Sequence, residues 1–221
     1  MAKVFISAGH GGSDPGAVAN NVKEKDLNLS IALACRDELV RHGVEVKMSR
    51  TKDENDPIGD EVKECNAYGP DLAVDIHNNA GGGDGGEVFY HNGGGKGKTL
   101  AENILAEIVK TGQNSRGIKT RVNSQGKDYY AFIRNTSCPA VIVECAFVDN
   151  ATDLKILATD GDRQKMGVAI AKGILRSLGV EIQANKGYWK VQVGACLYRE
   201  SAEALQKKIK AVGFDAFIVK E

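Results

Sequence analysis

The stretch Leu72-Ala73-Val74-Asp75-Ile76, which runs directly into His77, decides the fold of this chain of 221 residues. A short apolar run of this kind indicates a strand that is buried on both faces of a parallel sheet. Residues 3–8 form a similar run, and Gly9-His10 follows it. Because the carboxyl ends of parallel strands meet at one edge of a sheet, we expect His10 and His77 to lie close together in a cleft.

Strands and amphipathic helices alternate along the first 180 residues. Further strands are predicted at residues 44–48, 87–90 and 140–143, and helices at residues 24–40, 60–68, 100–109, 153–157 and 163–178. The polar stretch 112–127 is expected to be a surface loop. Alternating strands and helices are typical of an α/β fold, so we predict a twisted, mostly parallel sheet flanked by helices.

A polar linker at residues 181–187 divides the chain into two parts. Residues 1–180 are long enough for a full domain with a sizeable core. Residues 188–221 predict a small β-α-β module of the α+β class, with strands at 189–193 and 214–219 around a helix at 202–212. About 35 residues are few for a unit that folds alone, so this module is expected to need a partner surface.

Composition excludes several classes of partner. Lys plus Arg and Asp plus Glu number 29 each, so broad attraction to nucleic acid is not expected. No stretch approaches the ~20 apolar residues of a membrane span, so no membrane partner is expected. Residues 1–9 hold too short an apolar run for a secretory signal, and we expect synthesis in the cytoplasm without a signal peptide.

The cysteines form an odd set without a CxxC pair, which argues against a disulfide framework and against a thiolate metal cluster. We expect them to be reduced, buried packing residues. They are Cys35, Cys65, Cys138, Cys145 and Cys196.

Four polar residues stand at the ends of apolar strands or at the start of a helix, namely His10, Glu24, His77 and Glu144. Two imidazoles and a carboxylate bind zinc with a fourth position left for water, and a further carboxylate can then carry protons. Glu144 lies between Val143 and Cys145 in an apolar stretch, where a carboxylate is costly to bury unless it is paired, protonated or near a cation. The pattern alone leaves ordinary roles open, since Glu24 also suits the first turn of any helix.

Several motifs occur in the order and context of one family of zinc enzymes. They are Ala8-Gly9-His10-Gly11-Gly12-Ser13-Asp14-Pro15-Gly16-Ala17, Glu24-Lys25-Asp26-Leu27, Ser49-Arg50-Thr51, Ile76-His77-Asn78-Asn79-Ala80 and Pro139-Ala140-Val141-Ile142-Val143-Glu144-Cys145-Ala146-Phe147-Val148-Asp149-Asn150. With these motifs, residues 2–178 resemble the zinc-dependent N-acetylmuramoyl-L-alanine amidases of the amidase-3 type. The resemblance implies that His10, Glu24 and His77 are zinc ligands and that Glu144 is the catalytic carboxylate.

The resemblance implies hydrolysis of the amide between N-acetylmuramic acid and L-alanine in peptidoglycan, and therefore lysis of the cell wall by a phage endolysin or an autolysin. Asn79 and Arg134 are candidates for substrate binding. Asp75 stands where the family commonly has serine, next but one to His77. The alternatives are a zinc carboxypeptidase or peptidase acting on stem peptides, and a non-catalytic wall-binding protein with a structural zinc.

The tail resembles the first half of a SPOR-type peptidoglycan-binding repeat. The residues that carry this resemblance are Tyr188-Trp189-Lys190-Val191-Gln192-Val193-Gly194-Ala195, Ala202-Glu203-Ala204-Leu205 and Gly213-Phe214-Asp215-Ala216-Phe217. The family unit has β-α-β twice, whereas one copy is present here. We therefore expect two chains to pair their tails into a homodimer that binds peptidoglycan, with docking of the tail on the catalytic domain as the alternative. The protein is expected to act on the wall after its release.

Overall fold

The computed structural model describes residues 1–183, 194, 196–213 and 216–218, and its contacts divide the chain into two units, Met1–Gln183 and Ala184–Glu221. The part of the expected linker at 184–187 and the expected strand at 189–193 lie outside the described residues. The two units are described separately below.

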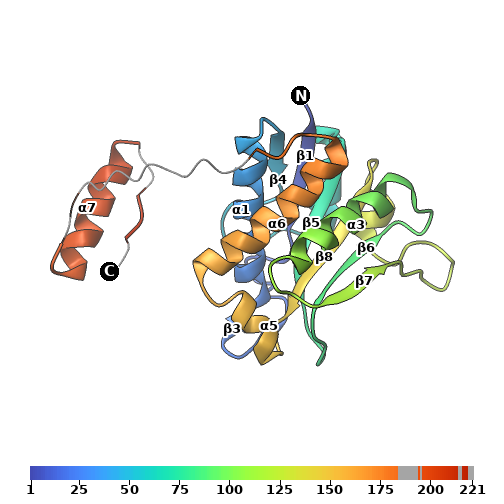
Figure 1. Ribbon diagram of the computed structural model, residues 1–221. Helices are drawn as coiled ribbons and strands as arrows, with labels where there is room; N and C mark the ends of the chain where they lie inside the picture. The colour runs from blue at the N-terminus through green and yellow to red at the C-terminus, as the bar shows by residue number, and fades with distance from the viewer. Residues whose placement is uncertain (184–193, 195, 214–215, 219–221) are drawn as a thin grey trace. The chain divides into compact units, whose positions relative to one another are not determined.

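The first unit is built on a six-stranded sheet with the order β4-β1-β5-β8-β6-β7 (Figure 1). Its strands are β1 Lys3–Ala8, β4 Glu45–Met48, β5 Leu72–Asn79, β6 Gly86–Tyr90, β7 Ser115–Lys119 and β8 Ala140–Phe147. Every neighbouring pair is parallel except β6 with β8, which is antiparallel. The predicted α/β class, with a mostly parallel sheet, is confirmed.

Alternate residues of the central strands supply two separate apolar layers. In β1, Val4 and Ile6 belong to a large buried cluster, whereas Phe5 belongs to a smaller one. In β5, Val74 belongs to the large cluster and Ala73 to the smaller. Because side chains of a strand alternate between its faces, every second residue of these strands lies on the side of the smaller cluster. This side carries the candidate site.

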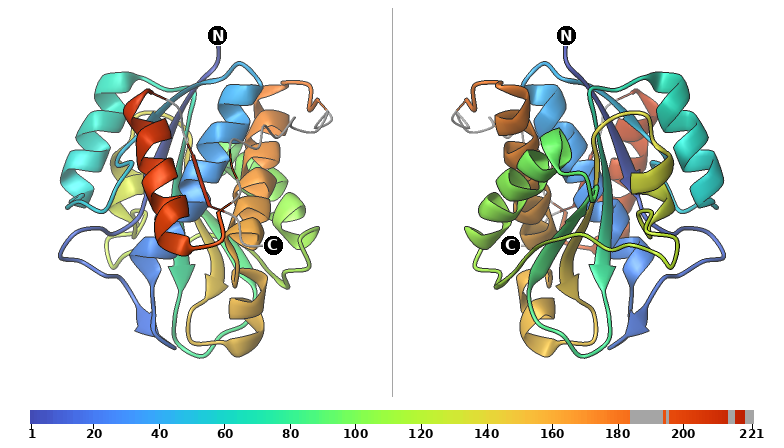
Figure 2. Two further views of the ribbon diagram at one scale, coloured as in Figure 1. Left: turned by 90° about the vertical axis from the view of Figure 1, so that its left-hand side faces the viewer. Right: turned by 90° about the vertical axis from the view of Figure 1, so that its right-hand side faces the viewer.

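Helices cover both faces of the sheet, as predicted. Their bounds are α1 Glu24–Arg41, α2 Ile58–Tyr68, α3 Gly95–Val109, α4 Ala131–Asn135, α5 Ala151–Ile156 and α6 Asp160–Leu178. Figure 1 looks onto the face covered by α1, α3 and α6, and α6 contacts both α1 and α3 over the large cluster. Figure 2 shows α2 on the opposite side of the sheet, and residues of α2 and α4 contribute to the smaller cluster. A short hairpin, β2 Val18–Ala19 with β3 Val22–Lys23, precedes α1.

The structure corrects three details of the predicted elements. The stretch 112–127 contains β7, which pairs in parallel with β6 at the edge of the sheet. An edge strand has few buried side chains, so its polar sequence gives no strand signal. Strands β5 and β8 run past their apolar stretches to Asn79 and Phe147, because pairing with each other continues there. The five-residue helix α4 was not predicted.

The described part of the second unit consists mainly of α7, Arg199–Ala211, close to the predicted helix at 202–212. None of the residues of α7 is buried, and residues 216–218 of the expected strand at 214–219 have no regular structure. Cys35, Cys65 and Cys145 are buried as expected, but Cys138 is only half-buried and Cys196 is exposed. Among the described residues, no helix is long and apolar enough to cross a membrane.

Candidate metal centre

Strand parity brings His77 and Glu144 together. His77 in β5 and Glu144 in β8 are direct partners in the parallel register. Both side chains lie on the face of the smaller cluster, since Ala73 and Ile142 of the same strands and the same parity belong to it. The extension of both strands past their apolar stretches therefore holds these two polar side chains on rigid, paired backbone.

His10 and Glu24 reach the same point from the neighbouring loop and helix. His10 comes two residues after the end of β1 and has a φ of 64°, in the left-handed region that only a few non-glycine residues adopt. Such backbone strain is typical of functional sites, because it aims a side chain in a direction that relaxed backbone does not allow. Glu24 is the first residue of α1 and is buried.

The three expected ligands form one cluster. Their ligand atoms all lie within 4.8 Å of one another, and no other such group of three occurs among the described residues. The Glu24 carboxylate lies between the two imidazoles, with Oε2 at 3.3 Å from His10 Nε2 and Oε1 at 3.0 Å from His77 Nδ1. The imidazole rings are nearly perpendicular, with centroids 4.9 Å apart.

Each imidazole also contacts an aspartate through the ring nitrogen that does not face Glu24. Asp14 Oδ2 lies 2.8 Å from His10 Nδ1, and Asp75 Oδ2 lies 3.1 Å from His77 Nε2. Carboxylates in these positions fix the tautomer and the ring orientation of metal-binding histidines. The aspartate at position 75, in place of the family's usual serine, thus holds the imidazole of an expected ligand.

The electrostatics of the cluster favour positive charge at its centre. The hydrogen bond to Glu24 raises the pKa of His10. Burial opposes charge on His77, but Asp75 and Glu24 outweigh it and raise the pKa of His77 well above its usual value. Burial likewise opposes charge on Glu24, yet the hydrogen bonds with both imidazoles lower its pKa. A buried carboxylate between two imidazoles, each backed by another acid, is a donor set that fits a zinc ion.

The backbone around the cluster is packed against its side chains. A Cβ at Gly9 would lie only 2.1 Å from His77 Cε1, so the ring rests directly on this glycine. The carboxylate of Glu24 also accepts hydrogen bonds from the backbone N–H groups of Ala17 at 2.9 Å and Asn78 at 3.2 Å. These contacts fix the positions of the His77 ring and of the Glu24 carboxylate.

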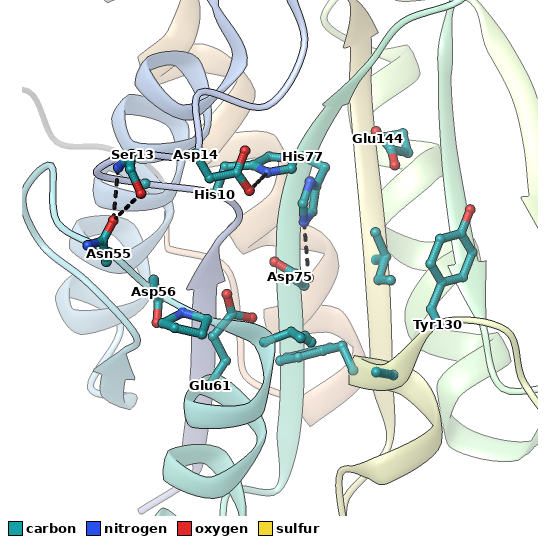
Figure 3. A pocket seen from close by; sticks show the side chains of 16 residues that line it. His10, Ser13, Asp14, Asn55, Asp56, Glu61, Asp75, His77, Tyr130 and Glu144 are labelled. Carbon is teal, nitrogen blue, oxygen red and sulfur yellow. Dashed lines mark hydrogen bonds and ion pairs between the residues drawn. The ribbon is translucent and has the colours of Figure 1, made fainter.

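Glu144 lines the same pocket without joining the ligand cluster. Its side chain is half-buried, and burial raises its pKa to about 7, although the neighbouring His77 acts in the opposite direction. A carboxyl group with a pKa near neutrality can accept and release a proton at physiological pH. Figure 3 shows Glu144 on the opposite side of His77 from His10.

The pocket has a volume of about 790 Å³ and is bounded by five parts of the chain. The loop after β1 and the segment that leads into α2 form one side, the start of α4 with Tyr130 forms the other, and β5 and β8 form the floor (Figure 3). A cavity of this size next to a ligand cluster can admit a sugar or a short peptide.

Comparison with known proteins places the chain in a family. Residues 4–176 match the model of the N-acetylmuramoyl-L-alanine amidase family Amidase_3. The chain belongs to the N-acetylmuramoyl-L-alanine amidase family. The fold and the amidase function that the motifs imply are thereby confirmed.

Three relatives illustrate this membership. A sporulation-specific N-acetylmuramoyl-L-alanine amidase of Bacillus subtilis (strain 168) is 34% identical over 99% of this chain and 85% of its own length. An endolysin of Bacillus phage SPP1 is 35% identical over 80% of this chain and 66% of its own length. The catalytic domain of CwlV, an amidase of Bacillus (Paenibacillus) polymyxa var. colistinus, superposes with a TM-score of 0.74 at 29% identity, over 82% of this chain and all of that domain.

The tail of this amidase also matches a family model. Residues 168–220 match the SPOR domain model, which confirms the resemblance seen in the tail sequence. The match begins inside α6, which packs against α1 and α3 of the first unit. The first residues of the matched range thus belong structurally to the catalytic unit.

The two expected substrate-binding residues have other contacts in the amidase structure. Asn79 donates a hydrogen bond to Glu87 Oε1 at 3.1 Å, and its own oxygen accepts one from the backbone of Ala80 at 2.8 Å. Arg134 lies in α4 and donates to the carbonyl oxygens of Asp128 at 2.7 Å and Tyr129 at 2.9 Å. Neither residue lines the pocket wall described above, and a role of either in substrate binding stays a prediction.

Sequence reasoning missed three acidic residues of the pocket, namely Asp14, Asp56 and Glu61. Asp14 follows His10 by four residues in a glycine-rich loop, and this spacing was a usable signal. No sequence signal marked Asp56 and Glu61, because acidic residues are common at or near the start of a helix.

Proposed function

We propose that His10, Glu24 and His77 hold a zinc ion and that Glu144 is the proton carrier in hydrolysis of the amide between N-acetylmuramic acid and L-alanine. The observation that supports this proposal is the His/Glu/His cluster beside Glu144 in a single pocket. A bound zinc ion supplies a Lewis acid that polarises the scissile carbonyl and lowers the pKa of a water molecule towards ~7.

The chain's own residues supply the proton transfers. Glu144 accepts a proton from the attacking water on its carboxylate oxygen and then donates it to the nitrogen of the leaving L-alanine. Its half-buried position and a pKa of about 7 suit both steps, because neither protonation state is strongly disfavoured. Asp14 and Asp75 hold the two imidazoles in orientation throughout the reaction.

The products of wall digestion test this proposal. Mass spectrometry of purified walls after digestion is expected to show muramic acid with an intact free lactyl carboxylate and stem peptides with a new L-alanine amino terminus. Removal of metal with a chelator is expected to abolish both products, and added zinc to restore them. Release of carboxyl-terminal residues from the stem peptides would instead indicate a carboxypeptidase, and unchanged walls would indicate a binding protein.

We further propose that the tail binds peptidoglycan as a homodimer. Large apolar side chains of the described tail residues are exposed, among them Leu197 at 89% and Phe217 at 77%. A small unit with exposed apolar side chains gains stability by burying them against a second copy.

Sedimentation equilibrium of the full chain tests the dimer. The expected mass is twice the 23.6 kDa of one chain. Phe217→Asp is expected to shift the chain to monomer, whereas Val122→Asp, which changes a 46% exposed apolar residue of the first unit, is expected to leave it dimeric. A monomeric wild-type chain at micromolar concentration would refute this proposal.

A further inference from the structure

The pocket extends past His77 into a region lined by three carboxylates, Asp56, Glu61 and Asp75, which we call the acidic arm. In Figure 3 the side chains of Glu61 and Asp75 point towards one another below His77. Asp75 lies on β5, Glu61 on α2, and Asp56 on the segment that leads into α2. One imidazole ring separates the arm from the ligand cluster, since Asp75 contacts His77 Nε2 while Nδ1 faces Glu24.

The carboxylates of the acidic arm are not fully satisfied. Asp75 is only 3% exposed, and its Oδ1 has no hydrogen-bond partner among the described residues. The Oδ2 of Asp56 is also buried without a partner in that part of the chain. Glu61, 4% exposed, accepts one hydrogen bond from Ser7 Oγ at 2.9 Å. An unpaired buried acceptor has lost its hydrogen bonds to water without replacement, and the loss is larger when the acceptor is charged.

Positive side chains neutralise the acidic arm only in part: His77 contacts Asp75, and the charge of Arg50 acts on Asp56 from nearby. The nearby guanidinium of Arg50 donates instead to the backbone carbonyl oxygens of Ala8 at 2.7 Å and Lys25 at 2.9 Å, among others. Burial, together with the charge of Asp75, raises the pKa of Glu61 to about 9. Negative charge is therefore crowded here, and a cation that entered the arm would relieve it.

We propose that the acidic arm binds a primary ammonium group of the wall fragment whose amide is cleaved. This inference rests on the function proposed above. An ammonium group carries three donors and no acceptor, which matches acceptors presented from two sides of the arm. A metal ion fits less well, because Asp56, Glu61 and Asp75 do not form a cluster with ligand atoms within 4.8 Å of one another.

A wall fragment can carry such an ammonium group in two places. One is the side chain of the diamino residue in the stem peptide, and the other is a sugar that lacks its N-acetyl group. Three soluble muramoyl-peptide fragments separate these sources. The first has a free peptide amine and acetylated sugars, the second has the peptide amine acetylated and one sugar deacetylated, and the third is acetylated at every amine.

The experiment measures kcat and KM of the zinc-loaded full chain on the three fragments. The wild-type chain is expected to cleave one of the two amine-bearing fragments with a kcat/KM at least about tenfold above that of the fully acetylated one, mainly through a lower KM. Glu61→Gln and Asp56→Asn are expected to reduce this preference, measured as the ratio of kcat/KM on the amine-bearing fragment to kcat/KM on the fully acetylated one. Asp60→Asn is the matched control, because it removes an exposed charge from the same helix.

Each outcome bears on one of the two proposals. Equal kcat/KM on all three fragments by the wild-type chain would overturn the acidic arm as an ammonium site, even if a variant failed to fold. A preference that persists in both folded variants would overturn it as well. Cleavage of none of the fragments, and of no intact wall, would overturn the proposed function and this inference with it.

Discussion

Gly9 leaves room for the imidazole ring of His77, an expected zinc ligand, because it has no side chain. The variant Gly9→Ala tests this role directly. A Cβ at this position would lie 2.1 Å from His77 Cε1 and 2.2 Å from Nε2. Ordinary contact begins at 3.4 Å, so the ring would have to retreat by about 1.3 Å. The backbone at Gly9 cannot yield in its place, because its N–H donates to Ile76 at 3.0 Å and its carbonyl accepts from Asn28 at 2.9 Å.

A displacement of this size exceeds what a metal site tolerates. Ligand distances in such sites hold to about 0.2 Å, and a shift of about 1 Å in a catalytic group costs on the order of 100-fold in rate. We therefore expect Gly9→Ala to lower kcat/KM about 100-fold and to weaken zinc binding. Hydrolysis of a soluble muramoyl-peptide and zinc content after competition with a chelator measure the two effects.

Gly59→Ala is the matched control. Gly59 lies in α2, and a Cβ there would meet nothing within 4 Å. The helix should gain up to about 1 kcal/mol from the substitution, with activity unchanged. Near-normal zinc content and turnover in Gly9→Ala would refute the argument that this glycine positions His77.

Three further predictions concern single side chains. Glu144→Gln is expected to keep its zinc and to lose about 10²–10⁴-fold in kcat, because an amide cannot accept the proton; near-normal turnover would exclude Glu144 as the proton carrier. His77→Ala is expected to lose its zinc, as measured by elemental analysis of the purified chain, and retained stoichiometric zinc would contradict the ligand assignment. Glu87 is buried and paired with Arg116 at 2.7 Å and Lys119 at 2.5 Å, contacts that outweigh burial and lower its pKa below the ordinary 4.5. Its stabilisation is therefore present above pH 4.5 and lost as the pH falls through the lowered pKa, so Glu87→Gln should reduce the melting temperature at pH 7 more than at pH 3. An equal reduction of the melting temperature at both pH values would contradict a stabilising role for the ion pairs of Glu87.

Much of the fold could be predicted because its signals are local. The buried strands β1, β5 and β8 contain apolar runs, and the long helices α1, α3 and α6 each bury a set of apolar residues. The edge strand β7 was missed, because its strand conformation depends on pairing with β6 rather than on its own side chains. The short helix α4 was missed for a similar reason, since five residues are too few to show a helical period.

For the candidate site, the sequence by itself indicated the residues that we propose carry the chemistry. His10, Glu24, His77 and Glu144 stand in motifs whose residue types and order suffice to indicate the reaction. Only the tertiary structure decided what surrounds them. The carboxylate of Asp75 behind His77, the contact of Gly9 with the same ring, and the approach of Glu61 from α2 join residues far apart in the chain. The physical reason is that orientation, burial and charge crowding depend on strand register and helix packing, which bring such residues together only in the folded molecule.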